Sequence, residues 1–496
     1  PPGPPPLPLI GNLLQLGRAP GPIPHSLTKL RKAKRYGKPV FTLYLGPRPV
    51  VVLTGPEAVK EVLIDKGEEF AKGRGDFNPT FPWLSKGYRE QGLLFSDNGP
   101  KWRKLRRFSL LTLRFHFGMG AYSKRSQKLE EPRIQEEARD LVERLRKEQA
   151  GSPIDITELL ARLAPLNVIC SLLFGVRFDY LRPEDPEFLK LIDKLLNEMF
   201  DRVSPWHQLL DIFPFLLRYL PGSLFRKAFK AAKDLKDYLD KLIEERRETL
   251  EPAGDPRRLD IGFLDSLLLE AKREGGNPKS ELSDEELAAT VLDLLFAGTE
   301  TTSSTLSWAL YLLAKHPEVQ AKLREEIDEV IGRDRSPTYD VDARAQMPYL
   351  DAVIKETLRL YPVVPLLLPR VATKDTEIPD GYLIPKGTLV IVNLYSLHRD
   401  PKVFPNPEEF DPERFLDENG KFKKSYAFLP FGAGPRNCLG ERLARMELFL
   451  FLATLLQRFP ELELAVPPGD IPSLTPKPEL GLPSKPPLYK VQLRPA

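Results

Sequence analysis

One helix predicted from the sequence is long enough to set the size of the fold. It begins at Ser283-Asp-Glu-Glu286, an S-x-x-E capping box that marks a helix start. It continues to Lys315-His316, where Pro317 stops it and opens the next helix. About 32 residues at 1.5 Å each give roughly 48 Å. We therefore expect a helix that crosses a large domain.

Composition excludes several classes of protein. The chain has 496 residues, and its 42% hydrophobic and 29% charged residues are those of a globular protein rather than a disordered one. A net charge of +4 is too balanced for a dedicated nucleic-acid binder, so no nucleic-acid partner is expected. Two cysteines exclude a disulfide scaffold and favour a reducing compartment. The five histidines have no zinc-type spacing, and no apolar run is long enough to span a bilayer.

The remaining periodic segments indicate a mainly α fold with a small β region. Residues 40–45 and 50–53 predict a β-hairpin, and 388–393 predict another strand. The predicted helices are 56–66, 135–148, 186–200, 224–250, 260–274, 349–361 and 441–459. The 51 prolines are spread between these segments and mark the ends of elements, and no linker divides the chain.

The centre of the long helix is unexpectedly polar. Ala297-Gly298-Thr299-Glu300-Thr301-Thr302 places a glycine, a carboxylate and hydroxyls where both flanks are apolar. Glycine costs about 1 kcal/mol inside a helix, and threonines that bond to the preceding turn bend it. Buried polar groups are costly unless they line a wet or reactive site. A solvent-facing stripe of hydroxyls is the alternative.

A glycine-rich loop carries one of the two cysteines. Phe431-Gly-Ala-Gly-Pro-Arg-Asn-Cys438-Leu-Gly440 is a tight loop whose amides can converge on one point, just ahead of a helix. A helix start favours a thiolate, and a thiolate ligates metal well. Gly440 lets a flat cofactor come close. Cys170, in contrast, lies in an apolar segment and is expected to be a small buried core residue.

A further pair of charges lies near the end of the predicted helix 349–361. Glu356 and Arg359 are three residues apart, so their side chains share one helix face. If the pair is buried with a second arginine, it forms a network that fixes register.

Together these motifs resemble those of the cytochromes P-450. Phe431-x-x-Gly434-x-Arg436-x-Cys438-x-Gly440 matches their haem-binding signature, in which a cysteine thiolate is the axial iron ligand. The polar helix centre resembles their oxygen-activating helix. Glu356-x-x-Arg359 with Pro412-Glu-Arg414-Phe resembles their structural network. The motifs follow the family's order along the whole chain.

The resemblance implies a fold, a cofactor and roles for residues of this chain. It implies a prism of helices around a buried haem b, with Cys438 as iron ligand and Glu300 and Thr301 relaying protons. Trp102 in Trp102-x-x-x-Arg106, together with Arg106, Arg370 and Arg436, would hold the haem propionates. The other implied haem contacts are Ala297, Phe431, Gly432, Gly440 and Ala444. The implied walls of the substrate pocket, half of which serve equally well as plain core, are Phe95, Leu294, Val364, Leu366 and Leu482.

The function implied is that of a monooxygenase of the microsomal, drug-metabolising family-two group. Segments such as 106–114, 117–120 and 177–180 resemble that group in particular. Electrons would come from NADPH–cytochrome P-450 reductase, with cytochrome b5 as a further candidate, and one oxygen atom would enter a lipophilic xenobiotic, steroid or fatty acid. Two alternatives stay open: a haem-thiolate isomerase or dehydratase that needs no external electrons, and a non-catalytic haem-binding protein.

The resemblance also implies a location and contact surfaces. Residues 1–8 resemble a proline-rich hinge behind a missing membrane anchor, with 9–496 as one catalytic domain on the cytoplasmic face of the endoplasmic reticulum. Residues 206–220 are rich in aromatic and aliphatic side chains and suit a membrane surface, with core packing as the alternative. Basic residues that flank Trp102 and Arg106 suit an acidic reductase, with a solvated charge run as the alternative; they are Lys101, Arg103, Lys104 and Arg107.

Overall fold

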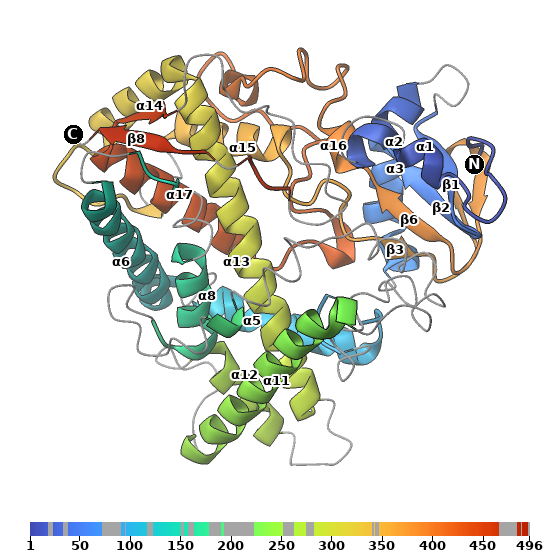
Figure 1. The fold of residues 1–496 in the computed structure, drawn as a ribbon, viewed down its shortest axis with the longest axis horizontal. Coiled ribbons are helices and arrows are strands. Elements are labelled where there is room, and N and C mark those ends of the chain that lie inside the picture. The colour runs from blue at the N-terminus through green and yellow to red at the C-terminus, as the bar shows by residue number, and fades with distance from the viewer. Residues whose placement is uncertain are drawn as a thin grey trace.

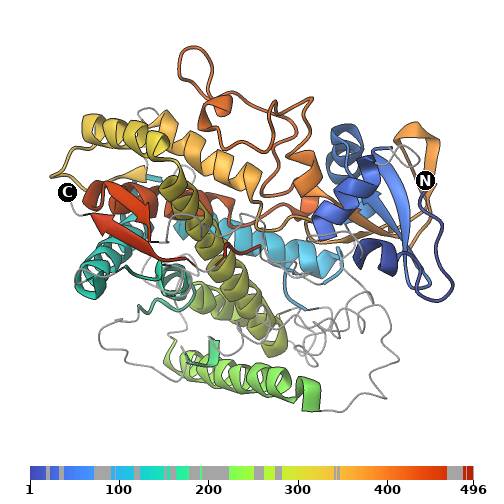
Figure 2. The ribbon, with the colours of Figure 1, turned by 45° about the horizontal axis from the view of Figure 1, so that its top comes forward.

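The predicted long helix runs through the middle of the molecule as α13 (Asp284–Lys315), and other helices pack around it (Figure 1). The computed structural model describes residues 1–17, 23–32, 38–71, 91–94, 96–116, 123–149, 153–156, 163–177, 190–192, 223–250, 262–273, 282–339, 342, 347–465, 484–487 and 489–494. The strands gather mostly on the side of the N-terminus, as Figure 2 shows from a second direction. The predicted fold class, mainly α with a small β region, is confirmed.

Most predicted helical segments recur in the structure, two of them with different bounds. The helices are α1 (Leu13–Gly17), α2 (Ile23–Lys32), α3 (Pro56–Lys60), α5 (Pro100–His116), α6 (Ser123–Gln149), α8 (Ala164–Phe174), α11 (Ser223–Thr249), α12 (Phe263–Arg273), α14 (Pro317–Val330), α15 (Pro348–Leu360), α16 (Leu394–Leu397) and α17 (Glu441–Arg458). Of these, α1, α2, α8 and α16 were not predicted. The predicted helix 56–66 is split, because a π-helical turn, Glu61–Asp65, follows α3. The predicted helix 135–148 begins earlier in the structure, because α6 continues through Pro132. Most of the predicted helix 186–200 lies outside the described residues.

The capping box at the start of α13 is half correct. The Ser283 hydroxyl accepts a hydrogen bond from the Glu286 amide at 3.4 Å, as predicted. The Glu286 side chain does not complete the box: its Oε1 accepts the Gly92 amide at 2.9 Å. Glu286 is buried, and its carboxylate also pairs with Lys101 of α5. A tertiary contact has therefore replaced the local one.

Gly298, in the polar centre of α13, permits close packing of two helices. A Cβ at this position would lie 2.8 Å from side-chain atoms of Ile169 in α8. Real Cβ atoms do not approach neighbours so closely, so α8 and α13 pack at this distance because residue 298 is glycine. Through this position α13 remains one uninterrupted helix. Close packing against α8 therefore explains why residue 298 is glycine.

The predicted hairpin and the predicted strand belong to one sheet. Strands β1 (Val40–Leu45) and β2 (Arg48–Leu53) pair antiparallel, and β2 pairs in parallel with β6 (Leu389–Val392). The sheet order is β1-β2-β6-β3, with β3 at Arg370–Val371. Two small ribbons complete the β structure; they are β4 (Thr376–Ile378) with β5 (Tyr382–Ile384) and β7 (Glu461–Leu464) with β8 (Val491–Arg494).

The proline-rich lead, residues 1–8, is fastened to the first strand. The Thr42 amide donates to the Pro2 carbonyl at 3.0 Å, and the Thr42 hydroxyl donates to the Pro1 carbonyl at 2.7 Å. Asn12 adds a side-chain hydrogen bond to the Pro4 carbonyl at 3.1 Å. The lead therefore packs along the edge of the sheet.

Candidate active site

The cysteine loop is shaped by two glycines in left-handed conformation. Gly432 and Gly434 have φ angles of 71° and 73°, which disfavour other residues. A Cβ on Gly434 would also lie 1.7 Å from the Leu63 carbonyl oxygen, so only glycine fits there. The Cys438 amide closes the loop by donating to the Phe431 carbonyl at 2.9 Å. The sequence thus presents Cys438 in a fixed loop directly before α17.

The Cys438 thiol lines an internal space rather than the outer surface. Its side chain is accessible, yet surrounding protein is dense enough that burial raises the pKa of the thiol to about 11. The Gly440 amide and Arg106 lower this pKa, but burial outweighs them. The amide at the helix start thus acts in the predicted direction, while burial acts against it. Metal coordination deprotonates such a thiol outright.

Three arginines from separate segments form a cationic cluster near this loop. Arg106 in α5 donates to the carbonyl and side-chain oxygens of Asn437, both at 2.7 Å. Arg370 in β3 donates to the Arg436 carbonyl at 3.3 Å. Burial, followed by repulsion from Arg106, lowers the pKa of Arg370 to about 10. Burial and repulsion from Arg370 and Arg106 lower the pKa of Arg436 to about 9.

The indole ring of Trp102 packs against two arginines of this cluster. The guanidinium carbon of Arg436 lies 3.9 Å from the centre of the indole ring, and that of Arg106 lies 5.3 Å away. The indole N–H donates to the Leu93 carbonyl at 3.0 Å. Trp102 therefore contacts both arginines through its ring face, where cations are attracted. Its N–H, predicted to help hold a propionate, has a protein partner in this structure.

No sequence motif indicated Asp293, the residue that positions the backbone at Leu93 and Leu94 beside Trp102. Asp293 of α13 accepts the amides of Leu93 at 2.6 Å and Leu94 at 2.9 Å. The Leu93 carbonyl in turn accepts both the Trp102 N–H and Arg436. Burial raises the pKa of Asp293 to about 7. The available signal was a lone acidic residue in an apolar helical stretch.

The two predicted catalytic residues lie in the polar centre of α13 but have different surroundings. Glu300 is buried, and its Oε1 lies 2.6 Å from Nζ of Lys485, a partner that the sequence did not indicate. The Thr301 hydroxyl donates to the Ala297 carbonyl at 2.6 Å. Ala297 is exposed although Leu295 and Thr299 on either side of it are fully buried. This part of α13 therefore also lines an accessible internal space.

The residues present fit a flat, dianionic, metal-containing cofactor. A buried cluster of mutually repelling guanidiniums favours a ligand with carboxylates. An accessible internal thiol offers one soft ligand to a metal. The other predicted contact residues also lie at this loop: Phe431, Gly432 and Gly440 belong to it, and Ala444 is in the first turn of α17, with its amide bonded to the Gly440 carbonyl at 2.9 Å.

The predicted pocket walls are only partly described. Leu294, Val364 and Leu366 are half-buried. Leu294 packs against the main hydrophobic core, whereas Leu366 packs against the cluster beneath β1 and β2. Phe95 and Leu482 lie outside the described residues, as does the predicted membrane-contact segment 206–220.

Glu356 lies at the centre of a buried ion network that the motif predicted. It accepts from Arg359 Nε at 2.6 Å and Nη2 at 2.8 Å, and from Arg414 Nε at 3.0 Å. The Asp411 amide adds a fourth hydrogen bond at 3.0 Å. Glu356 and Arg359 are both 0% exposed. Arg359 also donates to three backbone carbonyls, so the network ties α15 to the segment before the cysteine loop.

Comparisons with known proteins agree on one family. The sequence profile described as Cytochrome P450 matches residues 1–493. Cytochrome P450 2C26 of Mesocricetus auratus is 50% identical over 492 residues, which are 99% of this chain and 93% of that protein. Cytochrome P450 2C6 of Rattus norvegicus is 50% identical over 491 residues, with the same coverage of 99% and 93%. Cytochrome P450 2C16 of Oryctolagus cuniculus is 49% identical over 471 residues, 95% of this chain and 89% of that protein.

Proposed function

The chain belongs to the cytochrome P450 family, and on that premise we propose that it oxidises lipophilic xenobiotics, steroids or fatty acids with electrons from NADPH–cytochrome P-450 reductase. Family membership makes it a haem-thiolate monooxygenase with haem b as its cofactor. The observation that carries the proposal is identity near 50% to family-two cytochromes along almost the whole chain.

We assign the roles in holding haem b from the geometry around the cysteine loop. Cys438 provides the thiolate, and Arg106, Arg370 and Arg436 provide the positive charge for two propionates. Haem b, when bound, supplies an iron that activates dioxygen and inserts one oxygen atom into the substrate. Gly440 and Gly432 keep the loop free of side chains where the flat ring approaches.

In this proposal the polar centre of α13 relays protons to the reaction. When its hydroxyl turns away from the Ala297 carbonyl, Thr301 presents a proton at Oγ1, and the Glu300 carboxylate relays protons to it by accepting them from water and releasing them again. Lys485 holds the Glu300 carboxylate in place through their 2.6 Å ion pair. The apolar side chains of Leu294, Val364 and Leu366 suit a lipophilic substrate and keep bulk water away.

The partner surface proposed for the reductase, or for cytochrome b5, is the outer side of α5. Arg103, Lys104 and Arg107 are exposed there, and Arg103 pairs with Glu68 at 3.0 Å. Lys101 belongs less clearly to this surface, because it pairs with the buried Glu286. An acidic protein surface is the complement of such a basic one.

We also propose that the protein associates with the endoplasmic reticulum membrane, as its family-two relatives suggest, and that it faces the cytoplasm. In the described ranges, every helix is too short or too polar to cross a lipid bilayer. Residues 1–8 would serve as the connector, and 9–496 as one catalytic domain. The hydrogen bonds that Thr42 and Asn12 donate to carbonyls of residues 1–8 hold this connector against the domain.

Reconstitution with NADPH–cytochrome P-450 reductase tests the proposed function. A panel of lipophilic compounds should include substrates that increase NADPH consumption and gain one oxygen atom by mass. The Cys438→Ser variant serves as the matched inactive control. Conversion of a compound without NADPH would instead support the isomerase or dehydratase, and spectral binding with no conversion would support a non-catalytic haem protein.

A further inference from the structure

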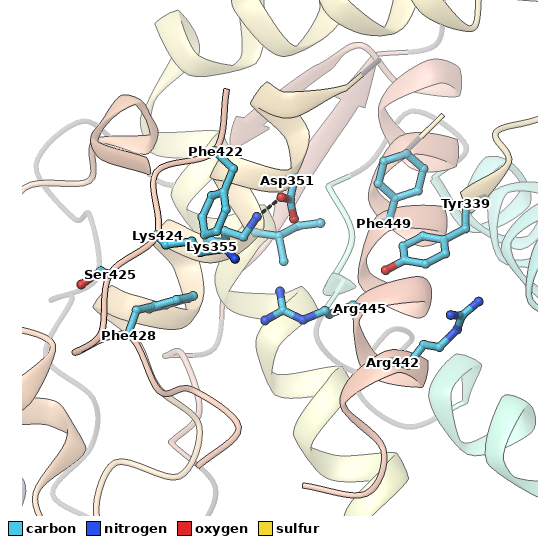
Figure 3. Close-up of a pocket in the computed structure, with 11 residues that line it drawn as sticks. Tyr339, Asp351, Lys355, Phe422, Lys424, Ser425, Phe428, Arg442, Arg445 and Phe449 are labelled. Carbon is cyan, nitrogen blue, oxygen red and sulfur yellow. Dashed lines mark ion pairs between the residues drawn. The ribbon is translucent and has the colours of Figure 1, made fainter. Parts of the chain in front are cut away.

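A cleft beside the cysteine loop opens between α15, α17 and the segment 422–428 (Figure 3), and the guanidinium of its lining residue Arg445 lies 4.9 Å from the centre of the Phe431 ring. Its cavity volume is about 530 Å³, within the range of small-molecule sites. Among the described lining residues four are cationic and one is acidic; these are Lys355, Lys424, Arg442, Arg445 and Asp351. Such an imbalance in a concave site favours an anion.

The cationic groups converge from three segments of the chain. In Figure 3 the charged ends of Lys355, Lys424 and Arg445 lie near one another, and the Lys355 ammonium points toward Asp351. Lys355 is buried, and Asp351 contacts its ammonium, while Arg445 pairs with Glu441 at 3.0 Å. Burial and then repulsion from Arg445 lower the pKa of Lys355 to about 7. The positive charges around the cleft therefore outnumber the carboxylates, Asp351 and Glu441, that pair with them.

Aromatic rings flank these charges. Phe422 lies above and Phe428 below them in Figure 3, and both rings pack on Phe415, with centroid distances of 6.3 Å and 4.8 Å. The Lys355 ammonium lies 3.7 Å from the centre of the Phe422 ring. A second aromatic pair, Tyr339 and Phe449, lines the same cleft. Flat aromatic groups, such as nucleic-acid bases, stack favourably on such rings.

We propose that this cleft binds a phosphate ester that carries a flat aromatic group, as a nucleotide does. The phosphate lies among Lys355, Lys424 and Arg445, and the flat group lies against the aromatic walls. Guanidinium and ammonium donors recognise phosphate oxygens by charge-assisted hydrogen bonds. The proposal does not depend on the proposed function, because no described lining residue is itself a predicted haem contact.

Two neighbouring lysines offer a matched test. Lys424 lines the cleft, whereas Lys423 is exposed and is not among the lining residues. Calorimetry of the haem-loaded protein, without reductase or substrate, should detect binding of adenosine monophosphate. K424E should weaken that binding by about tenfold or more, as loss of a charge-assisted contact implies. K423E makes the same charge change and should alter the dissociation constant less than twofold.

Three further ligands define the chemistry of the site. Inorganic phosphate should bind more weakly than adenosine monophosphate, because it lacks the stacking group, and adenosine should bind more weakly, because it lacks the anion. Succinate should bind more weakly than either phosphate compound. No binding of adenosine monophosphate at millimolar concentration would overturn the proposal. Equal weakening by K423E and K424E would also overturn it, since that result indicates diffuse surface charge, and so would succinate or adenosine binding as tightly as the nucleotide.

Discussion

Replacing Glu356 with glutamine should destabilise the fold without touching the chemistry. The carboxylate accepts four hydrogen bonds, three of them from Arg359 and Arg414. A neutral amide removes the charge that these guanidiniums face and turns an NH₂ group toward a donor. Breaking a buried pair in this way costs about 3–5 kcal/mol. With a urea m-value of about 3 kcal/mol/M or somewhat more for a large chain, the unfolding midpoint should fall by about 1 M.

Urea titration of the haem-loaded protein, followed by far-UV circular dichroism, measures this midpoint. The control is Glu413→Gln, because Glu413 makes a surface ion pair with Lys322 and such pairs contribute about 0–1 kcal/mol. Its midpoint should stay within about 0.3 M of the wild type. The reasoning is refuted if Glu356→Gln keeps the wild-type midpoint and haem content but loses turnover, since Glu356 would then act in the reaction.

The remaining predictions concern the site. Cys438→Ser should lose the red-shifted Soret band of the ferrous–CO complex; a retained band would identify another ligand. Thr301→Val should bind haem and substrate normally but release its electrons as hydrogen peroxide or water, because general acid help is worth about 10²–10⁴-fold and water replaces part of it; unchanged product per NADPH would remove Thr301 from the mechanism. The contribution of Asp293 to wild-type stability should fall between about pH 4 and pH 7, because the folded pKa of Asp293, about 7, exceeds its usual 3.8. The Asp293 contribution is complete below pH 4 and is lost as the pH rises, by at most about 1.4 kcal/mol per pH unit. Asp293→Asn should lack this part of the slope in urea midpoints measured across that range, and an identical slope would refute the assignment.

The sequence predicted best those elements that are specified locally. The start of α13 follows from Ser283, the start of α14 from Pro317, and the hairpin from two apolar segments joined by a turn that contains Gly46 and Pro47. It predicted poorly where tertiary packing overrides a local rule. Pro132 indicated a helix boundary, yet α6 continues through it. Glu286 suited a capping box, yet its side chain binds a distant loop.

The same distinction holds within the candidate site. The cysteine loop could be predicted, because its two glycines and its cysteine lie within one short segment and shape it together. Asp293 and Lys485 could not, because their partners lie far away in the sequence and no local pattern links them. The Cys438 thiol shows the limit of a local rule. Its place before α17 suggested a lowered pKa, whereas burial, a property of the whole fold, raises it.

The arginine cluster shows what folding adds to a motif. Arg106, Arg370 and Arg436 lie in α5, in β3 and in the cysteine loop, and each alone suits an ordinary surface role. Folding brings them together, and their lowered pKa values measure the resulting repulsion and loss of hydration. Repulsion of this kind opposes the folded state unless an anion balances it. A cofactor with two carboxylates therefore binds most strongly to the native arrangement, so haem binding and folding stabilise each other.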